Sequence, residues 1–324
     1  MSERVLILDL DTPLYASSAV CEKRTIIVTH TPTGIQKQFE NRTAFKTLLE
    51  QKEKLDQIKD YTIEDIQEPE DVSHGCKILK QMVKNIQEAV QADSTLFFIS
   101  GKTNFRDNLE LPRRYKSSRA NTLRPLLLKD VKQYAINKFN PCICEGEEPD
   151  DAIIYRSYEL KKQGYIPIIS SIDKDCLAYS GLLLFNQDHP ERGIVEIPEL
   201  GSLWIDAKAK VRGNGFLWFC FQTLNGDSID TFKPSELTGK KFGEKSAYKL
   251  LNNCKTEKEA LEVVLLQYKT WYPEAVTYTA WNEVEYTKDY VQIADMYFKC
   301  CRMKTTADDK LDFVEFCSKY GVTP

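Results

Sequence analysis

Short aliphatic runs alternate with amphipathic segments through the first part of the chain. Runs rich in β-branched residues, as expected for buried strands, lie at residues 5–11, 25–29, 95–99, 141–144 and 165–170. Helical spacing with a polar outer face is found between them, at residues 41–59, 75–92 and 149–162. The acidic stretch 64–71 is interpreted as a solvated loop. Strands that alternate with helices predict an α/β fold with a mostly parallel central sheet flanked by helices.

The pattern changes after about residue 175. Short strands are expected at residues 181–185 and 193–197, and from about residue 239 the chain shows helical spacing with lysine-rich faces. Residues after about 275 are also expected to be helical. We place a domain boundary near residue 200, between an α/β core at 1–200 and a mainly helical region at 201–324.

Composition supports a soluble, folded protein of about two domains. Of the 324 residues, 42% are hydrophobic and 28% are charged, which excludes intrinsic disorder and collagen-like chains. The formal net charge of −4 does not by itself indicate nucleic-acid binding. No apolar run approaches the roughly 18 residues that span a bilayer, and the N-terminus does not resemble a signal peptide. We therefore expect an intracellular protein with no membrane partner.

The ten cysteines are expected to be reduced and mostly buried. Several of them lie in apolar runs, where a free cysteine behaves as a small hydrophobic residue. The closest pair, Cys142 and Cys144, has neither a second pair nor a histidine at zinc-ligand spacing.

Acidic residues cluster where the predicted strands end. Four clusters follow a strand or an apolar run: Asp9 with Asp11; Glu145, Glu147, Glu148, Asp150 and Asp151; Asp173 with Asp175; and Asp227 with Asp230. Functional groups of open α/β sheets gather at the carboxyl ends of the strands, so these acids are expected to converge. Close carboxylates repel one another, and divalent cations relieve that repulsion. With only three histidines in the chain, oxygen ligation favours Mg²⁺ or Mn²⁺ over zinc.

A basic segment follows the strand at 95–99. Residues 101–132 carry nine lysines and arginines against three acids, although the whole chain is negative. Phe105 and Tyr115 lie among these cations, and aromatic rings can stack on bases while cations contact phosphates. A second basic region spans residues 239–251, where Gly243 precedes a predicted helix whose first N–H groups can bind a phosphate.

The order of these motifs resembles the bacteriophage branch of the 5′→3′ exonuclease and flap-endonuclease family. The matching segments are Leu8–Asp11, Asn104–Arg106, Tyr115–Arg119, Glu148–Asp151, Ser171–Asp175, Gly226–Asp230 and Gly243–Leu251. The resemblance implies a PIN-like nuclease core with a helical arch or clamp at about 101–124. It also implies a helix–three-turn–helix DNA-binding region, followed by C-terminal helices.

The resemblance further implies a role for each matched residue. Two metal ions would be held or oriented by Asp9, Glu148, Asp150 and Asp151 for the first, and by Asp173, Asp175, Asp227 and Asp230 for the second. Lys116 and Arg119 would be catalytic residues in the arch. Contacts with nucleic acid would come from Lys102, Arg106, Arg113, Arg114, Tyr115, Lys240, Lys241, Gly243 and Lys245, with Tyr115 stacking on a base. A K⁺ ion is a further expected ligand of the helix–three-turn–helix.

The implied activity is divalent-metal-dependent hydrolysis of DNA, as a 5′→3′ exonuclease or 5′ flap endonuclease. Expected substrates are 5′ ends, flaps and duplex–single-strand junctions, with RNA primers in RNA–DNA hybrids as a further candidate. The expected setting is phage DNA replication or recombination in the bacterial cytoplasm, and the expected state is a monomer. One departure from the family is that Ser100 and Gly101 stand where another metal-site aspartate is usual.

Two other interpretations remain open. Asp9 and Asp11 after a strand resemble the haloacid-dehalogenase phosphatase signature, with Ser100 as its second motif and Asp173, Asp175 or Asp227 as its late acid. Against this interpretation, Pro13 stands where that family prefers glycine, and residues 148–151 and the basic segment receive no role. A non-catalytic duplex- or flap-binding module on the same fold is the third interpretation. The retained acids argue against it, because negative charge near phosphates disfavours binding.

Overall fold

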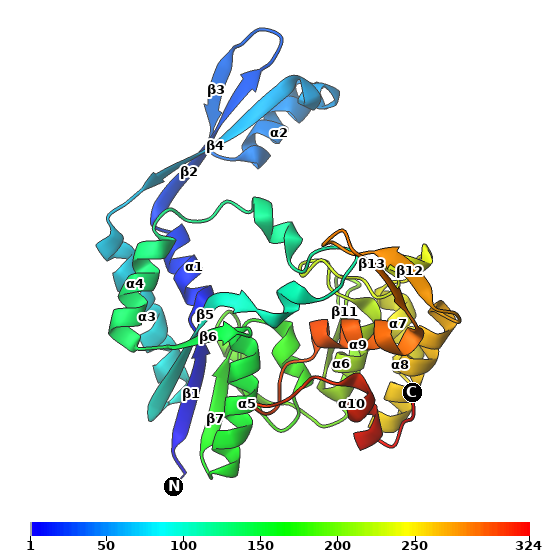
Figure 1. The fold of residues 1–324 in the computed structure, drawn as a ribbon. Coiled ribbons are helices and arrows are strands. Elements are labelled where there is room, and N and C mark those ends of the chain that lie inside the picture. The colour runs from blue at the N-terminus through cyan, green and yellow to red at the C-terminus, as the bar shows by residue number, and fades with distance from the viewer. Residues whose placement is uncertain (1) are drawn as a thin grey trace. The chain divides into compact units, whose positions relative to one another are not determined.

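The computed structural model, which describes residues 2–324, contains a mostly parallel six-stranded sheet (Figure 1). Its strand order is β6–β5–β1–β7–β8–β9, with β9 antiparallel to β8 and the other neighbours parallel. The strands are β1 (Arg4–Asp9), β5 (Ser94–Asn104), β6 (Cys142–Gly146), β7 (Ile166–Ser170), β8 (Leu183–Phe185) and β9 (Ile194–Glu196). The predicted α/β fold with a mostly parallel sheet is therefore confirmed.

The aliphatic run of β1 lies in the middle of this sheet. Leu6, Ile7 and Leu8 have no exposed surface, because β5 and β7 flank the strand and other elements cover its faces. Helix α5 (Pro149–Lys162) contacts β1, β5 and β7. Glu148 caps this helix in a capping box with Asp151, and Pro149 takes the first helical position.

The chain forms two compact units, and their limits differ from the predicted boundary near residue 200. One unit contains the chain up to Leu10, Asn85–Thr122 and Pro141–Pro324, and the other contains Asp11–Lys84 and Leu123–Asn140. Residues beyond 200 belong to the sheet-containing unit because they share its hydrophobic core, which extends from Ile7 in β1 to Phe313 near the C-terminus. The division between the two units falls within helix α3 (Val72–Val90), between Lys84 and Asn85.

The C-terminal part of the sheet-containing unit is mainly helical. Its elements are the pair β10 (Ser202–Ile205) and β11 (Val211–Asn214), α6 (Gly215–Asn225), α7 (Glu244–Leu251), α8 (Glu257–Trp271), the pair β12 (Val276–Thr279) and β13 (Glu285–Lys288), α9 (Tyr290–Cys301) and α10 (Phe313–Lys319). The expectation that residues after about 275 are all helical is therefore wrong in part. The β12–β13 hairpin forms there because alternating residues such as Tyr278 and Tyr286 pair across the strands.

The smaller unit contains a three-stranded antiparallel sheet. Its order is β3 (Gln36–Phe39), β2 (Glu22–His30), β4 (Tyr61–Pro69), and α2 (Arg42–Gln51) contributes to a small core with it. Helices α1 (Asp11–Ala19) and α4 (Leu128–Phe139) belong to the same unit. The predicted loop at 64–71 is wrong, because most of it is β4. This strand is in register with β2 from Tyr61 to Pro69, and this pairing forms the strand despite the acidic composition.

The prediction of a helical arch at about 101–124 is also wrong, because this segment forms no α-helix in the described chain. Between Phe105 and Thr122 the described chain contains only two short 3₁₀ helices, at Phe105–Asn108 and Ser117–Asn121. Pro112 interrupts the segment, and contacts described below hold Tyr115 and Lys116 against acidic side chains. The predicted helix at 41–59 likewise ends at Gln51 and continues as a 3₁₀ helix at Leu55–Asp60. Within residues 2–324, no helix combines the length and the apolar character needed to cross a bilayer.

Candidate functional site

Three of the predicted acidic clusters follow parallel strands of the same sheet. Strand β1 ends at Asp9, β6 leads through Glu147 to Glu148, and β7 leads to Asp173. Because the strands run in the same direction, their carboxyl ends lie at one edge of the sheet. The topology therefore brings together acids that are far apart in the sequence.

Asp150 is the most perturbed carboxyl group of this cluster. Burial raises its pKa well above the ordinary range, and the negative charges of Asp173, Asp9 and Glu148 raise it further. The cation of Lys116 acts in the opposite direction. These interactions show that the four carboxylates share one low-dielectric region, in which a bound cation would stabilise their charged forms.

Asp151 and Arg106 form a buried ion pair beside this cluster. Arg106 Nη1 lies 2.6 Å from Asp151 Oδ2, and Nη2 lies 3.0 Å from Oδ1. The remaining guanidinium donors reach the carbonyl oxygens of Lys299 and Arg302 at 3.1 and 2.8 Å. Asp151 also accepts from the backbone N–H of Lys304 at 3.1 Å.

This pair corrects two predicted roles. Arg106 is only 2% exposed and its donors are occupied within the protein, so it does not contact nucleic acid in this arrangement. Asp151 has no exposed surface, and both of its oxygens accept hydrogen bonds from the protein, so it positions the cluster instead of serving as a metal ligand. The sequence offered no signal for the contribution of residues 299–304 to this network.

The basic segment contacts the acidic cluster directly. Lys116 Nζ forms an ion pair with Glu148 and lies 3.9 Å from Asp230 Oδ1, while Arg119 Nη2 lies 2.9 Å from the same Asp230 oxygen. Burial lowers the pKa of Lys116, but the charges of Glu148 and Asp230 outweigh burial and raise it above its ordinary value. Lys116 is therefore a fixed cation at the carboxylates.

Tyr115 does not present its ring to a nucleic-acid base. The side chain is 4% exposed and stacks on Phe232, with ring centroids 6.4 Å apart. Its hydroxyl lies 3.2 Å from Glu148 Oε2 and 3.1 Å from Asp230 Oδ2, within reach of a donated hydrogen bond to either. The predicted stacking role is wrong for this arrangement, because the ring belongs to the hydrophobic core and the hydroxyl faces the acidic cluster.

A second acidic group surrounds Lys174. Lys174 Nζ lies 2.5 Å from Asp227 Oδ2, and Gln222 Nε2 donates to Asp175 Oδ1. Burial and the charge of Asp173 raise the pKa of Asp175 to about 8. Burial also raises the pKa of Asp227, but the hydrogen bond and charge of Lys174 outweigh it and lower the pKa overall. The prediction from sequence included neither Lys174 nor Gln222, because they lie between or away from the acidic motifs.

The donor set fits hard divalent cations. The acids around Asp150 and Asp175 offer carboxylate oxygens, which Mg²⁺ and Mn²⁺ prefer. Within residues 2–324, no three of these acids have ligand atoms all within 4.8 Å of one another. Their charges are instead balanced by the neighbouring cations Lys116, Lys174 and Arg119. The chemistry of the donors agrees with the predicted metals.

The additional aspartate that the sequence resemblance implies has no room at Gly101. A Cβ atom there would lie 2.4 Å from the carbonyl oxygen of Cys144 and 2.6 Å from Cδ of Glu145. The Glu145 carboxylate accepts from the backbone N–H of Lys102 at 3.0 Å and from the Thr103 hydroxyl at 3.3 Å. Strand pairing between β5 and β6 and the Glu145 side chain therefore exclude any larger residue at this position without rearrangement.

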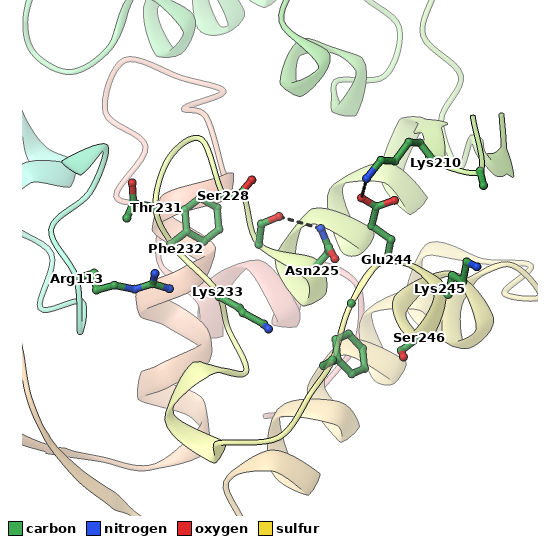
Figure 2. Close-up of a pocket in the computed structure, with 14 residues that line it drawn as sticks. Arg113, Lys210, Asn225, Ser228, Thr231, Phe232, Lys233, Glu244, Lys245 and Ser246 are labelled. Atoms are coloured by element: carbon green, nitrogen blue, oxygen red, sulfur yellow. Dashed lines mark hydrogen bonds and ion pairs between the residues drawn. The ribbon is translucent and has the colours of Figure 1, made fainter. Parts of the chain in front are cut away.

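A basic pocket lies beside the start of α7. It has a volume of about 710 Å³, and Figure 2 shows Arg113 and Lys233 on one side and the Lys210–Glu244 ion pair on another. Gly243 caps α7 without a side chain, which leaves the first N–H groups of the helix at the pocket. Lys245 lines the same pocket and is exposed, as are the preceding Lys240 and Lys241.

The other predicted contacts with nucleic acid are exposed cations. Arg113 pairs with Glu236 through Nη2 at 2.7 Å, and Arg114 lies over the ring of Trp281 at 5.3 Å. Lys102 is exposed near the end of β5. These side chains, unlike Arg106 and Tyr115, remain available to a phosphate backbone.

No protein-family model and no curated protein matches the chain. Among solved structures, the chain is similar to the bacteriophage T5 D15 protein co-crystallized with metal ions, with 14% identity, a TM-score of 0.47 and coverage of 98% of this chain and 92% of that chain. It is also similar to the bacteriophage T5 D15 flap endonuclease in a pseudo-enzyme–product complex with DNA and metal ions. That match has 13% identity and a TM-score of 0.44, and it covers 82% of this chain and 88% of the other. The match to a T5 5′-exonuclease mutant has 13% identity and a TM-score of 0.43, and it covers 98% of this chain and 91% of the other.

Proposed function

We propose that the protein is a divalent-metal-dependent nuclease that hydrolyses phosphodiester bonds in DNA from 5′ ends and 5′ flaps. The observation that supports this most directly is the environment of Asp150. A buried carboxyl group surrounded by Asp9, Glu148 and Asp173 has its pKa raised strongly, and Lys116 lies beside it. Perturbed carboxyl groups of this kind are typical of functional sites.

The acids divide into two groups of candidate ligands. Asp9, Glu148 and Asp150 would hold one ion, and Asp173, Asp175, Asp227 and Asp230 would hold or orient a second. When bound, a pair of divalent ions activates water and stabilises the leaving oxygen in phosphodiester hydrolysis. Asp151 is placed outside this set because Arg106 holds both of its oxygens.

Cationic residues would orient the substrate. Lys116 and Arg119 hold Glu148 and Asp230, and the same cations would bind the oxygens of the scissile phosphate. The pocket at α7 would bind the duplex backbone through Lys245 and the N–H groups that follow Gly243. The exposed Lys240 and Lys241, which precede the pocket along the chain, would add further contacts. A K⁺ ion at this pocket is part of the proposal.

The proposal also includes the polarity of DNA cleavage and the biological setting of the enzyme. We propose 5′→3′ exonuclease and flap-endonuclease activity of a monomer in phage DNA replication or recombination, in the cytoplasm of a bacterial host. RNA–DNA hybrids are proposed as a second substrate. Support comes from the order of the motifs and from the cations beside the acidic cluster.

A flap-cleavage assay tests the proposal. A duplex with a 5′ flap, labelled separately at each end, is incubated with Mg²⁺, Mn²⁺ or EDTA and with the wild type, Asp150→Asn or Asp308→Asn. Asp308 is an exposed acid outside the cluster and provides a matched control. We expect metal-dependent release of short 5′ products by the wild type and Asp308→Asn, and none by Asp150→Asn. Equal cleavage by Asp150→Asn would contradict the site.

The same assay separates the alternative functions. Tight flap binding without cleavage in either metal would indicate a non-catalytic binding module. If the protein neither bound nor cleaved the flap, a phosphatase assay on a small phosphomonoester would test the nucleophile role of Asp9. That role leaves the Glu148–Asp150 cluster unexplained, so the nuclease is the function that the site supports best.

A further inference from the structure

A thiol, a carboxylate and an imidazole lie close together at one end of the antiparallel sheet of the smaller unit. The Cys21 thiol, the Glu70 carboxylate and the His74 imidazole each offer one ligand atom, and these atoms all lie within 4.8 Å of one another. We propose that they bind a borderline transition-metal ion such as Zn²⁺, at a site separate from the proposed nuclease centre.

Strand pairing brings the first two residues together. The β2–β4 ladder ends at the pair Glu22 and Pro69, so Cys21 and Glu70 stand directly beyond it. The backbone N–H of Glu70 donates to the carbonyl oxygen of Cys21 at 2.8 Å, which fixes their spacing. The chain between them, residues 22–69, forms the sheet and α2.

The first turn of α3 adds the third residue. His74 follows Glu70 by four residues, and its Nδ1 lies 2.6 Å from Glu70 Oε2. The next residue, Gly75, lies against Cys21, since a Cβ atom placed on it would be 3.6 Å from the Cys21 sulfur. The helix can therefore approach the thiol closely.

The chemistry of the three donors selects the ion. Sulfur, imidazole nitrogen and carboxylate oxygen together suit Zn²⁺, whereas Mg²⁺ prefers oxygen alone. Cys21 has no exposed surface, while the side chains of His74 and Glu70 are 53% and 52% exposed. The ion would enter from solvent between His74 and Glu70, with the thiolate as the inner ligand and water in the fourth position.

A bound ion would join the start of β2 and the end of β4, at one end of the sheet, to α3. Cys21 precedes β2, Glu70 follows β4, and His74 belongs to the helix. The unfolded chain does not hold these three ligands together, so the ion would bind the folded state preferentially and stabilise the smaller unit.

The alternative is an ordinary surface ion pair beside a buried thiol. The chain provides a matched example without a cysteine partner in the cluster, because His189 Nδ1 lies 3.1 Å from Glu191 Oε1. Variants at the two histidines therefore distinguish metal binding from a simple histidine–carboxylate pair.

Cobalt titration of the full-length, metal-stripped protein tests the site. A cobalt–thiolate bond gives a near-ultraviolet charge-transfer band that the oxygen ligands of the nuclease site cannot produce, so the outcome is independent of nuclease activity. We expect the wild type to develop this band and Zn²⁺ to abolish it by displacement. Cys21→Ser should lack the band, and His74→Gln should weaken Co²⁺ binding by more than about tenfold. His189→Gln and Cys142→Ser, which alters an exposed cysteine, should behave as the wild type.

Thermal unfolding gives a second readout. Zn²⁺ should raise the unfolding midpoint of the wild type and of His189→Gln, but not that of Glu70→Gln, an exposed substitution that leaves the buried thiol in place. The absence of a thiolate band in the wild type would overturn the site. The site would also be overturned if both His74→Gln and Glu70→Gln kept the cobalt–thiolate band and bound Co²⁺ as tightly as the wild type.

Discussion

Arg106 and Asp151 form a bidentate ion pair that is closed to solvent, with N–O distances of 2.6 and 3.0 Å and exposures of 2% and 0%. The same guanidinium donates to carbonyl oxygens of Lys299 and Arg302, at the end of α9. A strand end, the start of α5 and the C-terminal region therefore meet at one charged contact. This contact fixes the helix that carries Asp150.

Removing one partner of this ion pair should lower the free energy of unfolding substantially. Arg106→Ala leaves the Asp151 carboxylate buried without its counter-charge, and we expect the free energy of unfolding to fall by about 3–5 kcal/mol. Arg192→Ala, at an exposed arginine 3.9 Å from Glu191, should change it by less than about 1 kcal/mol. Urea unfolding measures both.

The paired replacement provides the corresponding control. Arg106→Met combined with Asp151→Leu removes both charges, and we expect it to recover part of the lost stability. Recovery should be incomplete, because the backbone groups of Lys299, Arg302 and Lys304 lose their hydrogen-bond partners. If Arg106→Ala were as stable as Arg192→Ala, the pair would not contribute as described.

Lys116 is predicted to act on the reaction more than on binding. Its ammonium group lies at Glu148 and near Asp230, so Lys116→Ala should slow single-turnover cleavage by about a hundredfold or more. Arg113→Ala, at the rim of the α7 pocket, should weaken duplex binding without slowing saturated turnover. An unchanged single-turnover rate for Lys116→Ala would remove that residue from the catalytic site.

The α7 pocket is predicted to set the salt dependence of duplex binding. The slope of log K against log salt is negative, and each lost phosphate contact reduces its magnitude by about 0.9 for duplex DNA. Lys245→Ala should show that decrease, whereas Lys258→Ala, which alters a lysine of α8 paired with Glu262, should not. Equal slopes for the two variants would place the duplex elsewhere.

The raised pKa of Asp175 predicts a pH-dependent stability. Burial and Asp173 shift this pKa from 3.8 to about 8, so between these values the folded protein holds a proton that the unfolded chain releases. In EDTA, stability should therefore fall as pH rises through this window, by at most about 1.4 kcal/mol per pH unit from this group. Asp175→Asn should reduce the slope, and Mg²⁺ should stabilise most at the alkaline end.

Unfolding curves across that window test this prediction. The slope of the wild type in EDTA is compared with its slope in Mg²⁺ and with the slope of Asp175→Asn. A wild-type stability in EDTA that rises with pH would show that other groups dominate the linkage.

The sequence by itself determined the sheet and the positions of the acids along it. The aliphatic run of β1 requires burial on both faces, and Asp9 ends it in the structure as the pattern predicted. Helix α5 follows the predicted range because Pro149 and the acids after it suit a helix start. These features depend on residues close in the chain, and local patterns record them well.

Only the tertiary structure decided which charged residues serve the site and which hold the fold. Arg106 and Arg113 are equivalent in a basic sequence pattern, yet one is buried against Asp151 and the other lies exposed at a pocket. The Cys21–Glu70 contact likewise arises only when β2 pairs with β4. Long-range pairing and burial determine the partner of each charge, and a charge buried without a partner is unfavourable, so neighbours distant in sequence fix these roles.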